Sequence, residues 1–139
     1  VLREGTDVTI VAAGVEIDEA MKAADALAGQ GVSAEVVDAF CIKPLDAGTI
    51  LASVAKTGCI VTAEEHSVIG GLGGAVSELL AEAHPAPLER VGMRDCFGTS
   101  GEFEELLAYF HLDAPSIVEA ALKVIARKEA KEHIAGSRA

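Results

Sequence analysis

Short apolar runs alternate along this chain with segments of helical periodicity, and this alternation constrains the fold more than any other feature. The first run, residues 7–13, is nearly continuously apolar and ends at Gly14, which is typical of a strand covered on both faces. The next segment spaces its apolar residues three and four positions apart between Ile17 and Ala28 and stops at Gly29. No Asn-Gly or Asp-Gly hairpin signal occurs, so the pattern predicts an α/β fold with a mostly parallel sheet between helical layers.

The same pattern continues to the end of the chain. Four internal strands and five helices are expected, with the later strands at 34–38, after Cys59 and at 88–93. Asp46 is predicted to cap the second helix and Asp113 to open the last one. A strand through residues 1–3 is expected to lie antiparallel on an edge, because the few residues after it are too short for a parallel crossover.

Composition narrows the class of protein. The 139 residues are the size of one domain, and the formal net charge of -11 argues against nucleic-acid binding, which needs clustered Lys and Arg. No apolar run reaches the roughly 18–20 residues of a membrane helix and no export signal opens the chain, so a cytoplasmic protein without membrane contacts is expected. Cys41, Cys59 and Cys96 are expected to be reduced and to fill small spaces in the core. The start at Val1 without Met suggests a piece of a longer polypeptide.

Familiar catalytic motifs are missing from the sequence or incomplete. The four histidines are scattered without metal-ligand spacing, so no metal site is expected, and no phosphate-binding G-x-x-x-x-G-K-[ST] run occurs. Residues 98–101 resemble a nucleophile elbow, but Glu102 stands where the closing glycine of that motif should be. Ser100 is predicted to cap a helix instead. The helix after the first strand opens with Glu16, Asp18 and Glu19, which would repel a phosphate bound there.

The stretch 59–76 is the strongest candidate for function. It combines a buried strand, a polar turn with Glu64, Glu65 and His66, a glycine cluster and the start of an amphipathic helix. In one interpretation the backbone N–H groups bind an anion and His66 donates a hydrogen bond or shuttles a proton. In the other, the glycines allow close packing against a neighbouring domain while the carboxylates face solvent or a partner's arginine. The adjacent carboxylates disfavour an anion, so the packing interpretation is preferred.

Four phrases resemble, in order and spacing, the C-terminal domain of the transketolase family of thiamine-diphosphate enzymes. They are GTDVTIVAAG at 5–14, VDAFCIKPLD at 37–46, AEEHSVIGGLG at 63–73 and FGTSG at 97–101. The resemblance implies a three-layer α/β/α domain, residues 1–125, with a five-stranded mixed sheet whose first strand is antiparallel. Residues 126–139 are expected to form a charged helical extension or tail. His111 departs from the family, which usually has glycine there, and a left-handed turn would cost histidine more.

The resemblance also implies a place in a larger enzyme. In transketolases this is the third domain, which helps to build the dimer and borders the substrate channel. Thiamine diphosphate and Mg²⁺ are held by the diphosphate-binding and pyrimidine-binding domains, usually through Gly-Asp-Gly and paired Asn. This chain has neither Gly-Asp-Gly nor any Asn, so no cofactor-binding, metal or catalytic residue is expected in it. The residues implied at a domain interface or channel edge are Glu64, Glu65, His66, Gly70, Gly71, Gly73, Arg94 and Asp95.

The parent expected from this resemblance moves two-carbon ketol units between sugar phosphates of the pentose phosphate pathway, as a homodimer or a heterotetramer. Two alternatives remain open. The same domain type is similar to parts of deoxyxylulose-phosphate synthases and of the β subunits of 2-oxo-acid dehydrogenases. A third hypothesis, of another class, is a regulatory module whose glycine turn binds an anion.

Overall fold

A four-stranded parallel sheet forms the centre of the computed structural model, which describes residues 1–136. The strands are β1 (Val8–Ala13), β2 (Ala34–Asp38), β3 (Ile60–Ser67) and β4 (Leu88–Met93). Their order in the sheet is β2-β1-β3-β4, and all three neighbouring pairs are parallel. β1 is almost wholly buried and β3 is buried over residues 60–64, as expected for apolar runs covered on both faces.

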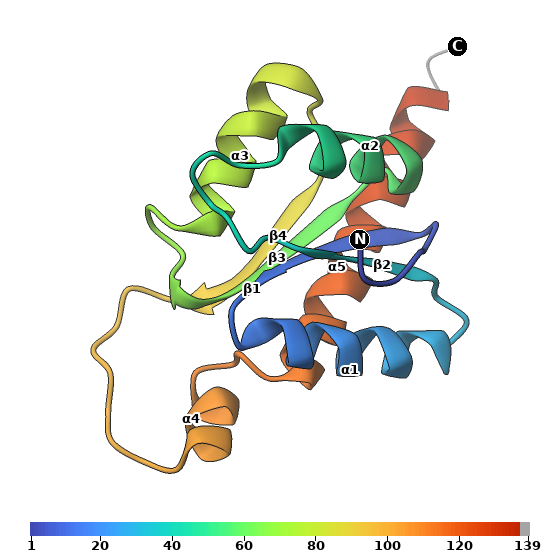
Figure 1. Cartoon of the computed structure of the whole chain (residues 1–139). Helices are drawn as coiled ribbons and strands as arrows, with labels where there is room; N and C mark the ends of the chain where they lie inside the picture. The colour runs from blue at the N-terminus through green and yellow to red at the C-terminus, as the bar shows by residue number, and fades with distance from the viewer. Residues whose placement is uncertain (137–139) are drawn as a thin grey trace.

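Helices cover both faces of the sheet (Figure 1). On one face lie α1 (Glu16–Ala28) and α5 (Ala114–Gly136), which pack against each other and the sheet. On the other face lie α2 (Ala47–Thr57) and α3 (Leu72–Ala83). The short helix α4 (Phe103–Tyr109) stands outside these layers, at the end of a long loop that leaves β4. The predicted α/β/α arrangement with four internal strands and five helices is confirmed.

The sheet separates two hydrophobic clusters because successive side chains of a strand point to opposite faces. Ile10 and Val61 belong to the cluster under α1 and α5, whereas Val11 and Ile60 belong to the cluster under α2 and α3. Neighbouring residues of β1 and β3 therefore serve different layers. This shared central pair of strands joins the two halves of the core into one domain.

The prediction of a fifth, antiparallel edge strand is wrong in its extent. The N-terminal segment does run antiparallel to β2, but it forms only an isolated bridge between Arg3 and Val36. Leu2 N–H donates to the Val36 carbonyl at 2.8 Å, and Val36 N–H donates to the Arg3 carbonyl at 2.9 Å. Beyond this bridge, Gly5 lies close to the backbone of β2, where a Cβ atom would lie 2.2 Å from Ala34 C.

Two of the predicted helix starts are confirmed and a third is wrong. Asp46 does cap α2, since its Oδ1 accepts from Thr49 N–H at 3.1 Å. Asp113 does precede α5 and accepts from Ser116 N–H at 3.2 Å. The predicted cap at Ser100 is wrong: α4 begins two residues further on, with Glu102 in the N-cap position and no side-chain cap.

The prediction for the cysteines is correct for one residue of the three. Cys59 is buried, but Cys41 is half-buried and Cys96 is exposed, because the latter two lie in loops at strand ends instead of in strands.

The last helix is longer than the periodic apolar segment that predicted it. It continues beyond residue 125 to Gly136, and residues 137–139 of the expected tail lie outside the described part of the chain. Lys128 still contacts the body of the domain, donating to the carbonyls of Asp7 and Thr57 at 3.1 Å each. Among the described residues, no helix is long and apolar enough to cross a membrane.

Candidate functional site

The carboxyl ends of the central strands meet at one edge of the sheet, where the candidate residues lie. β1 ends beside Gly14, β3 continues through Glu65 and His66, and Met93 at the end of β4 is in register with Ser67. The register of β3 and β4 shifts between Ala63 and Ser67, which lets the polar end of β3 turn away from its neighbour.

Glu64 occupies the N-terminus of α3, where the anion-binding hypothesis places a ligand. Its two carboxylate oxygens accept from Leu72 N–H at 2.7 Å and Gly73 N–H at 2.8 Å, at the N-terminus of α3. The side chain is buried, which differs from the expectation that it faces solvent or a partner. A carboxylate at this position satisfies free N–H groups and the positive end of the helix dipole. The domain therefore supplies its own anion here.

The glycines of the turn make room for this carboxylate. A Cβ atom on Gly71 would lie 2.1 Å from Glu64 Oε2, and one on Gly73 would lie 2.8 Å from Arg90 Cδ. Gly70 has a φ of +78°, a left-handed conformation that glycine adopts without strain. Close packing inside the domain thus requires Gly71 and Gly73, and the backbone conformation favours glycine at position 70.

Glu65 and His66 face outward. Both are exposed, and His66 Nδ1 lies 2.9 Å from the Ser67 carbonyl and 4.0 Å from Glu64 Oε2. Together with Gly14 and Ile42 they line an open hollow of about 430 Å³ at the end of the sheet. Glu64 and Glu65 are adjacent on β3 and thus have different roles, because successive side chains of a strand point to opposite faces. Glu64 caps α3, whereas Glu65 is exposed.

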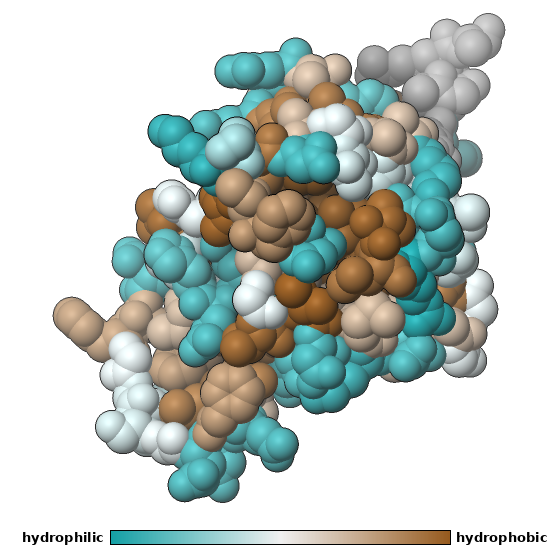
Figure 2. All heavy atoms as spheres, in the orientation of Figure 1, coloured by the Kyte–Doolittle hydropathy of each residue, from teal (hydrophilic) through white to brown (hydrophobic). Residues whose placement is uncertain are grey.

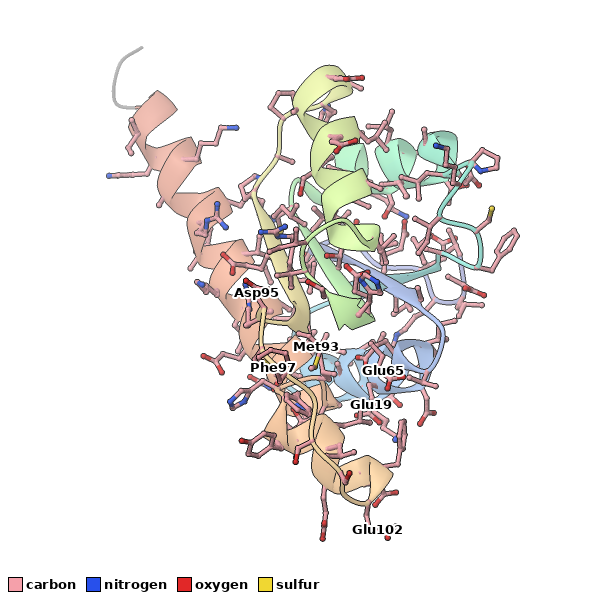
Figure 3. The ribbon with its side chains drawn as sticks, turned by 90° about the vertical axis from the view of Figure 1, so that its left-hand side faces the viewer. Glu19, Glu65, Met93, Asp95, Phe97 and Glu102 are labelled. Carbon is pink, nitrogen blue, oxygen red and sulfur yellow. The ribbon has the colours of Figure 1, made fainter. Side chains whose placement is uncertain are left out.

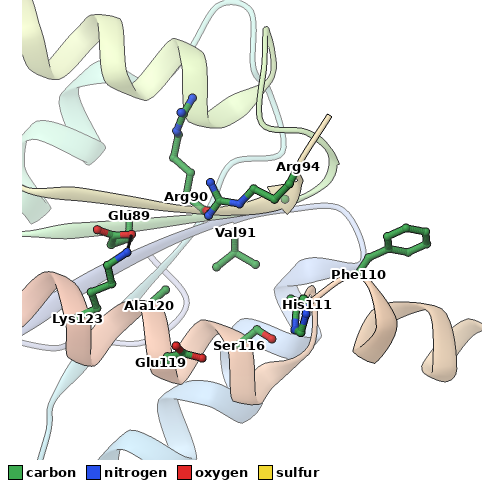
Figure 4. Close-up of a pocket in the computed structure, with 11 residues that line it drawn as sticks. Glu89, Arg90, Val91, Arg94, Phe110, His111, Ser116, Glu119, Ala120 and Lys123 are labelled. Atoms are coloured by element: carbon green, nitrogen blue, oxygen red, sulfur yellow. Dashed lines mark hydrogen bonds and ion pairs between the residues drawn. The ribbon is translucent and has the colours of Figure 1, made fainter. Parts of the chain in front are cut away.

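Arg94 and Asp95 follow β4 directly and are exposed. Arg94 turns back along the strand, and its guanidinium donates to the Arg90 carbonyl at 2.7 Å (Figure 4). Asp95 has a φ of +53° where the chain leaves the sheet. The two residues lie at the same end of the sheet as the glycine turn, but Arg94 is directed toward the outer edge of β4.

A pocket of about 190 Å³ lies between this outer edge and α5 (Figure 4). Several charged residues in and beside it are engaged with one another or with backbone carbonyls. Glu89 pairs with Lys123 at 2.9 Å and with Arg127 at 2.5 Å, and Arg127 also donates to the Leu88 carbonyl. Arginine side chains therefore cover two carbonyl groups of an edge strand, which would otherwise be free to pair with another chain.

Sequence reasoning missed the most unusual carboxylate of the domain, Glu16. It begins α1, is fully buried, and neither of its carboxylate oxygens has a hydrogen-bond partner. Burial, followed by the negative charges of Glu19, Glu65 and Asp113, raises the pKa of Glu16 to about 7. Its position at a helix N-terminus suggested an ordinary exposed residue. Only the packing of α1 beside β3 and the start of α5 creates this cluster.

Within the described residues, no group of three or more His, Cys, Asp or Glu side chains is placed to hold a metal ion. The edge of the sheet therefore offers a capped helix, an exposed carboxylate and imidazole, and exposed apolar side chains.

The family described as "Transketolase, C-terminal domain" matches residues 1–117. The chain belongs to this family. The resemblance drawn from the four sequence phrases is confirmed.

This transketolase C-terminal domain is similar to parts of three longer proteins. It is 54% identical over 127 residues to the 6-deoxy-6-sulfo-D-fructose transketolase subunit SqwH of Clostridium sp. (strain MSTE9), covering 91% of this chain and 39% of that protein. It is 41% identical over 132 residues to 1-deoxy-D-xylulose-5-phosphate synthase 1 of Geobacter sulfurreducens, covering 94% of this chain and 21% of that protein. A solved structure described as a split gene transketolase, inactive beta4 tetramer, matches with a TM-score of 0.89 and 47% identity, over 92% of this chain and 42% of that one. The transketolase C-terminal domain described here thus spans less than half the length of these relatives.

Proposed function

We propose that this domain is the C-terminal part of a transketolase that transfers two-carbon ketol units between sugar phosphates. The observation that carries the proposal is the 54% identity to a transketolase subunit over 91% of this chain. The share of 39% of that subunit favours the smaller chain of a split enzyme, which would assemble as a heterotetramer in the cytoplasm. A single-chain parent would be a homodimer.

In this proposal the domain holds no cofactor of its own. Thiamine diphosphate and Mg²⁺ belong to the diphosphate-binding and pyrimidine-binding domains of the parent, and residues 1–125 form the third domain. The lack of Asn and Gly-Asp-Gly supports this division, as does the use of Glu64 for capping α3. The isolated domain is inactive. Its extension from residue 126 continues α5.

The proposed role of the sheet edge is to contact the neighbouring domains and to border the substrate channel. Glu65 and His66 contribute exposed side chains, whereas Glu64, Gly70, Gly71 and Gly73 hold the shape of the turn, and Arg94 and Asp95 extend the surface beyond β4. Large apolar side chains are exposed in the loops after the strands: Phe40, Ile42, Ile69 and Phe97. Figure 2 shows hydrophobic side chains gathered on one face of the domain. Exposed apolar patches mark contact surfaces.

The main alternative keeps the domain and changes the reaction. The identity of 41% to a deoxyxylulose-phosphate synthase supports a parent that uses pyruvate. The β subunit of a 2-oxo-acid dehydrogenase is a further parent of the same type. The anion-binding module is less well supported, because Glu64 already occupies two N–H groups of α3.

An assay of the full-length parent with its partner chain tests the proposal. Ketol transfer from xylulose 5-phosphate, with no turnover of pyruvate, is the expected result, and the opposite preference would favour the synthase. Replacing His66 by Ala should leave the affinity for thiamine diphosphate within about twofold, since His66 is assigned to a surface contact. A large loss of cofactor affinity would contradict that assignment.

A further inference from the structure

A second pocket lies between the end of β4 and α4, and the proposed function gives it no role. Its volume is about 280 Å³, slightly below the roughly 300–1,000 Å³ of small-molecule sites. The walls are largely apolar and include Met93, Phe103, Leu106, Leu107, Phe110 and Leu112. Glu65 is the carboxylate among the lining residues, and in Figure 3 it lies near Met93 at the end of the strand. A pocket of this size and lining suits one long side chain better than a whole ligand.

The carboxylate of Glu65 has no counter-charge. Glu65 is exposed, and it has no hydrogen bond or ion pair with any residue that the structure describes. Behind it lies Glu16, buried and with both oxygens unpartnered. Burial, followed by the charges of Glu19, Glu65 and Asp113, raises the pKa of Glu16 to about 7, as expected in a strongly negative environment.

Two cations on neighbouring elements, Lys22 of α1 and Arg94 after β4, are engaged elsewhere. Lys22 pairs with Asp18 and Glu19 at 2.7 Å each. Arg94 is directed to the Arg90 carbonyl on the far side of β4. Glu65 thus has no ion pair within the described residues, and a cation from outside the domain would complement its charge.

We propose that this pocket receives an arginine side chain from the neighbouring domain of the same enzyme, with its aliphatic stem against the apolar walls and its guanidinium at Glu65. The partner rests on the proposed function, since it requires a larger enzyme. Arginine fits better than lysine because its planar, weakly hydrated head group stacks on aromatic rings such as those of Phe103 and Phe110. Arginine is also enriched in protein interfaces, where lysine is depleted.

Binding of a peptide to the 139-residue chain tests the pocket. The probe is acetyl-Gly-Arg-Gly-amide, and the control is the same peptide with neutral citrulline. With methyl-labelled methionine, Met93 reports the pocket, while Met21 of α1 is an internal reference. The arginine peptide should shift the Met93 signal saturably at millimolar concentration without moving Met21, and the citrulline peptide should bind at least fivefold more weakly. An unshifted Met93, or equal binding of the two peptides, would overturn the proposal.

A pair of variants separates a specific contact from attraction to the negative domain as a whole. Glu65→Gln should weaken the arginine peptide at least fivefold, whereas Glu82→Gln, an exposed position on α3, makes the same charge change and should weaken it less than twofold. Equal effects of the two variants would reject Glu65 as the receptor. Both side chains are exposed, so both variants should keep the melting temperature of the unsubstituted domain.

An experiment on the longer parent protein tests whether a neighbouring domain fills the pocket. There the pocket should already be filled by the neighbouring domain, so the same peptide should leave Met93 unshifted. A saturable shift in the parent would show an open pocket and overturn the assignment of the partner. Neither result depends on which sugar the enzyme uses, so failure of this inference and failure of the transketolase proposal can be told apart.

Discussion

Glu16 makes the clearest prediction for a single residue. The folded domain holds its proton up to about pH 7, whereas the unfolded chain loses it near the ordinary pKa of 4.5. The contribution of Glu16 to stability should therefore fall as the pH rises from about 4.5 to about 7, and stay low above that. The difference corresponds to at most roughly 3 kcal/mol. Urea unfolding of Glu16→Gln at pH 5 and pH 8 checks this: the variant should gain stability over the native domain only at pH 8.

The charged groups that act on Glu16 are Glu19 on α1, Glu65 on β3 and Asp113 before α5. Glu82→Gln, on an exposed part of α3, is the control and should keep the native pH profile. If Glu16→Gln also keeps that profile, the buried carboxyl is not the source of the pH dependence.

Replacing glycine by alanine should destabilise the domain at Gly71 and stabilise it at Gly74. Gly71→Ala places a methyl group against the Glu64 carboxylate and removes the bonds to α3, so it should cost about 2 kcal/mol or more. Gly74→Ala meets nothing within 4 Å and lies in the helix, so it should add about 0.5–1 kcal/mol. Denaturant unfolding of the two variants measures the contrast, and similar values would refute the packing argument.

At the scale of elements, the turn from α4 into α5 has a strained residue. His111 has a φ of +56°, and its N–H donates to the Ala108 carbonyl at 3.2 Å. A non-glycine residue in this conformation costs about 1 kcal/mol or more relative to glycine. We therefore expect His111→Gly to be more stable than His111→Ala by about 1 kcal/mol, measured by thermal unfolding. Equal melting temperatures would mean that the turn relaxes to accommodate a side chain.

At the scale of the whole molecule, the two hydrophobic clusters should unfold together. They lie on opposite faces of the sheet but share β1 and β3. Leu27→Ala, in α1, and Leu72→Ala, in α3, should each cost about 2–5 kcal/mol because both side chains are fully buried. Each variant should weaken amide-exchange protection in α1 and α3 by similar amounts. Loss of protection confined to the mutated half would mean that the layers unfold independently.

The sequence by itself determined the order and type of the elements, because apolar periodicity and turn residues act locally. The run 8–13 and the helical spacing after it each appear in the structure nearly as predicted, as does the cap at Asp46. The same local signals failed where they were weak. Ser100 offered a hydroxyl without an apolar helical run immediately behind it, and residues 1–3 carry no local signal for the length of the edge ladder.

The tertiary structure alone decided which charges meet. Glu64 and Glu65 are adjacent and chemically alike, but the pleat of β3 turns the first toward α3 and leaves the second exposed. Glu16 and Asp113 are far apart in the chain, and the docking of α1 beside α5 brings the charge of Asp113 near Glu16. Long-range packing has no signature in spacing or composition, so the capped helix, the buried carboxyl and the unpaired Glu65 could be found only in the folded domain.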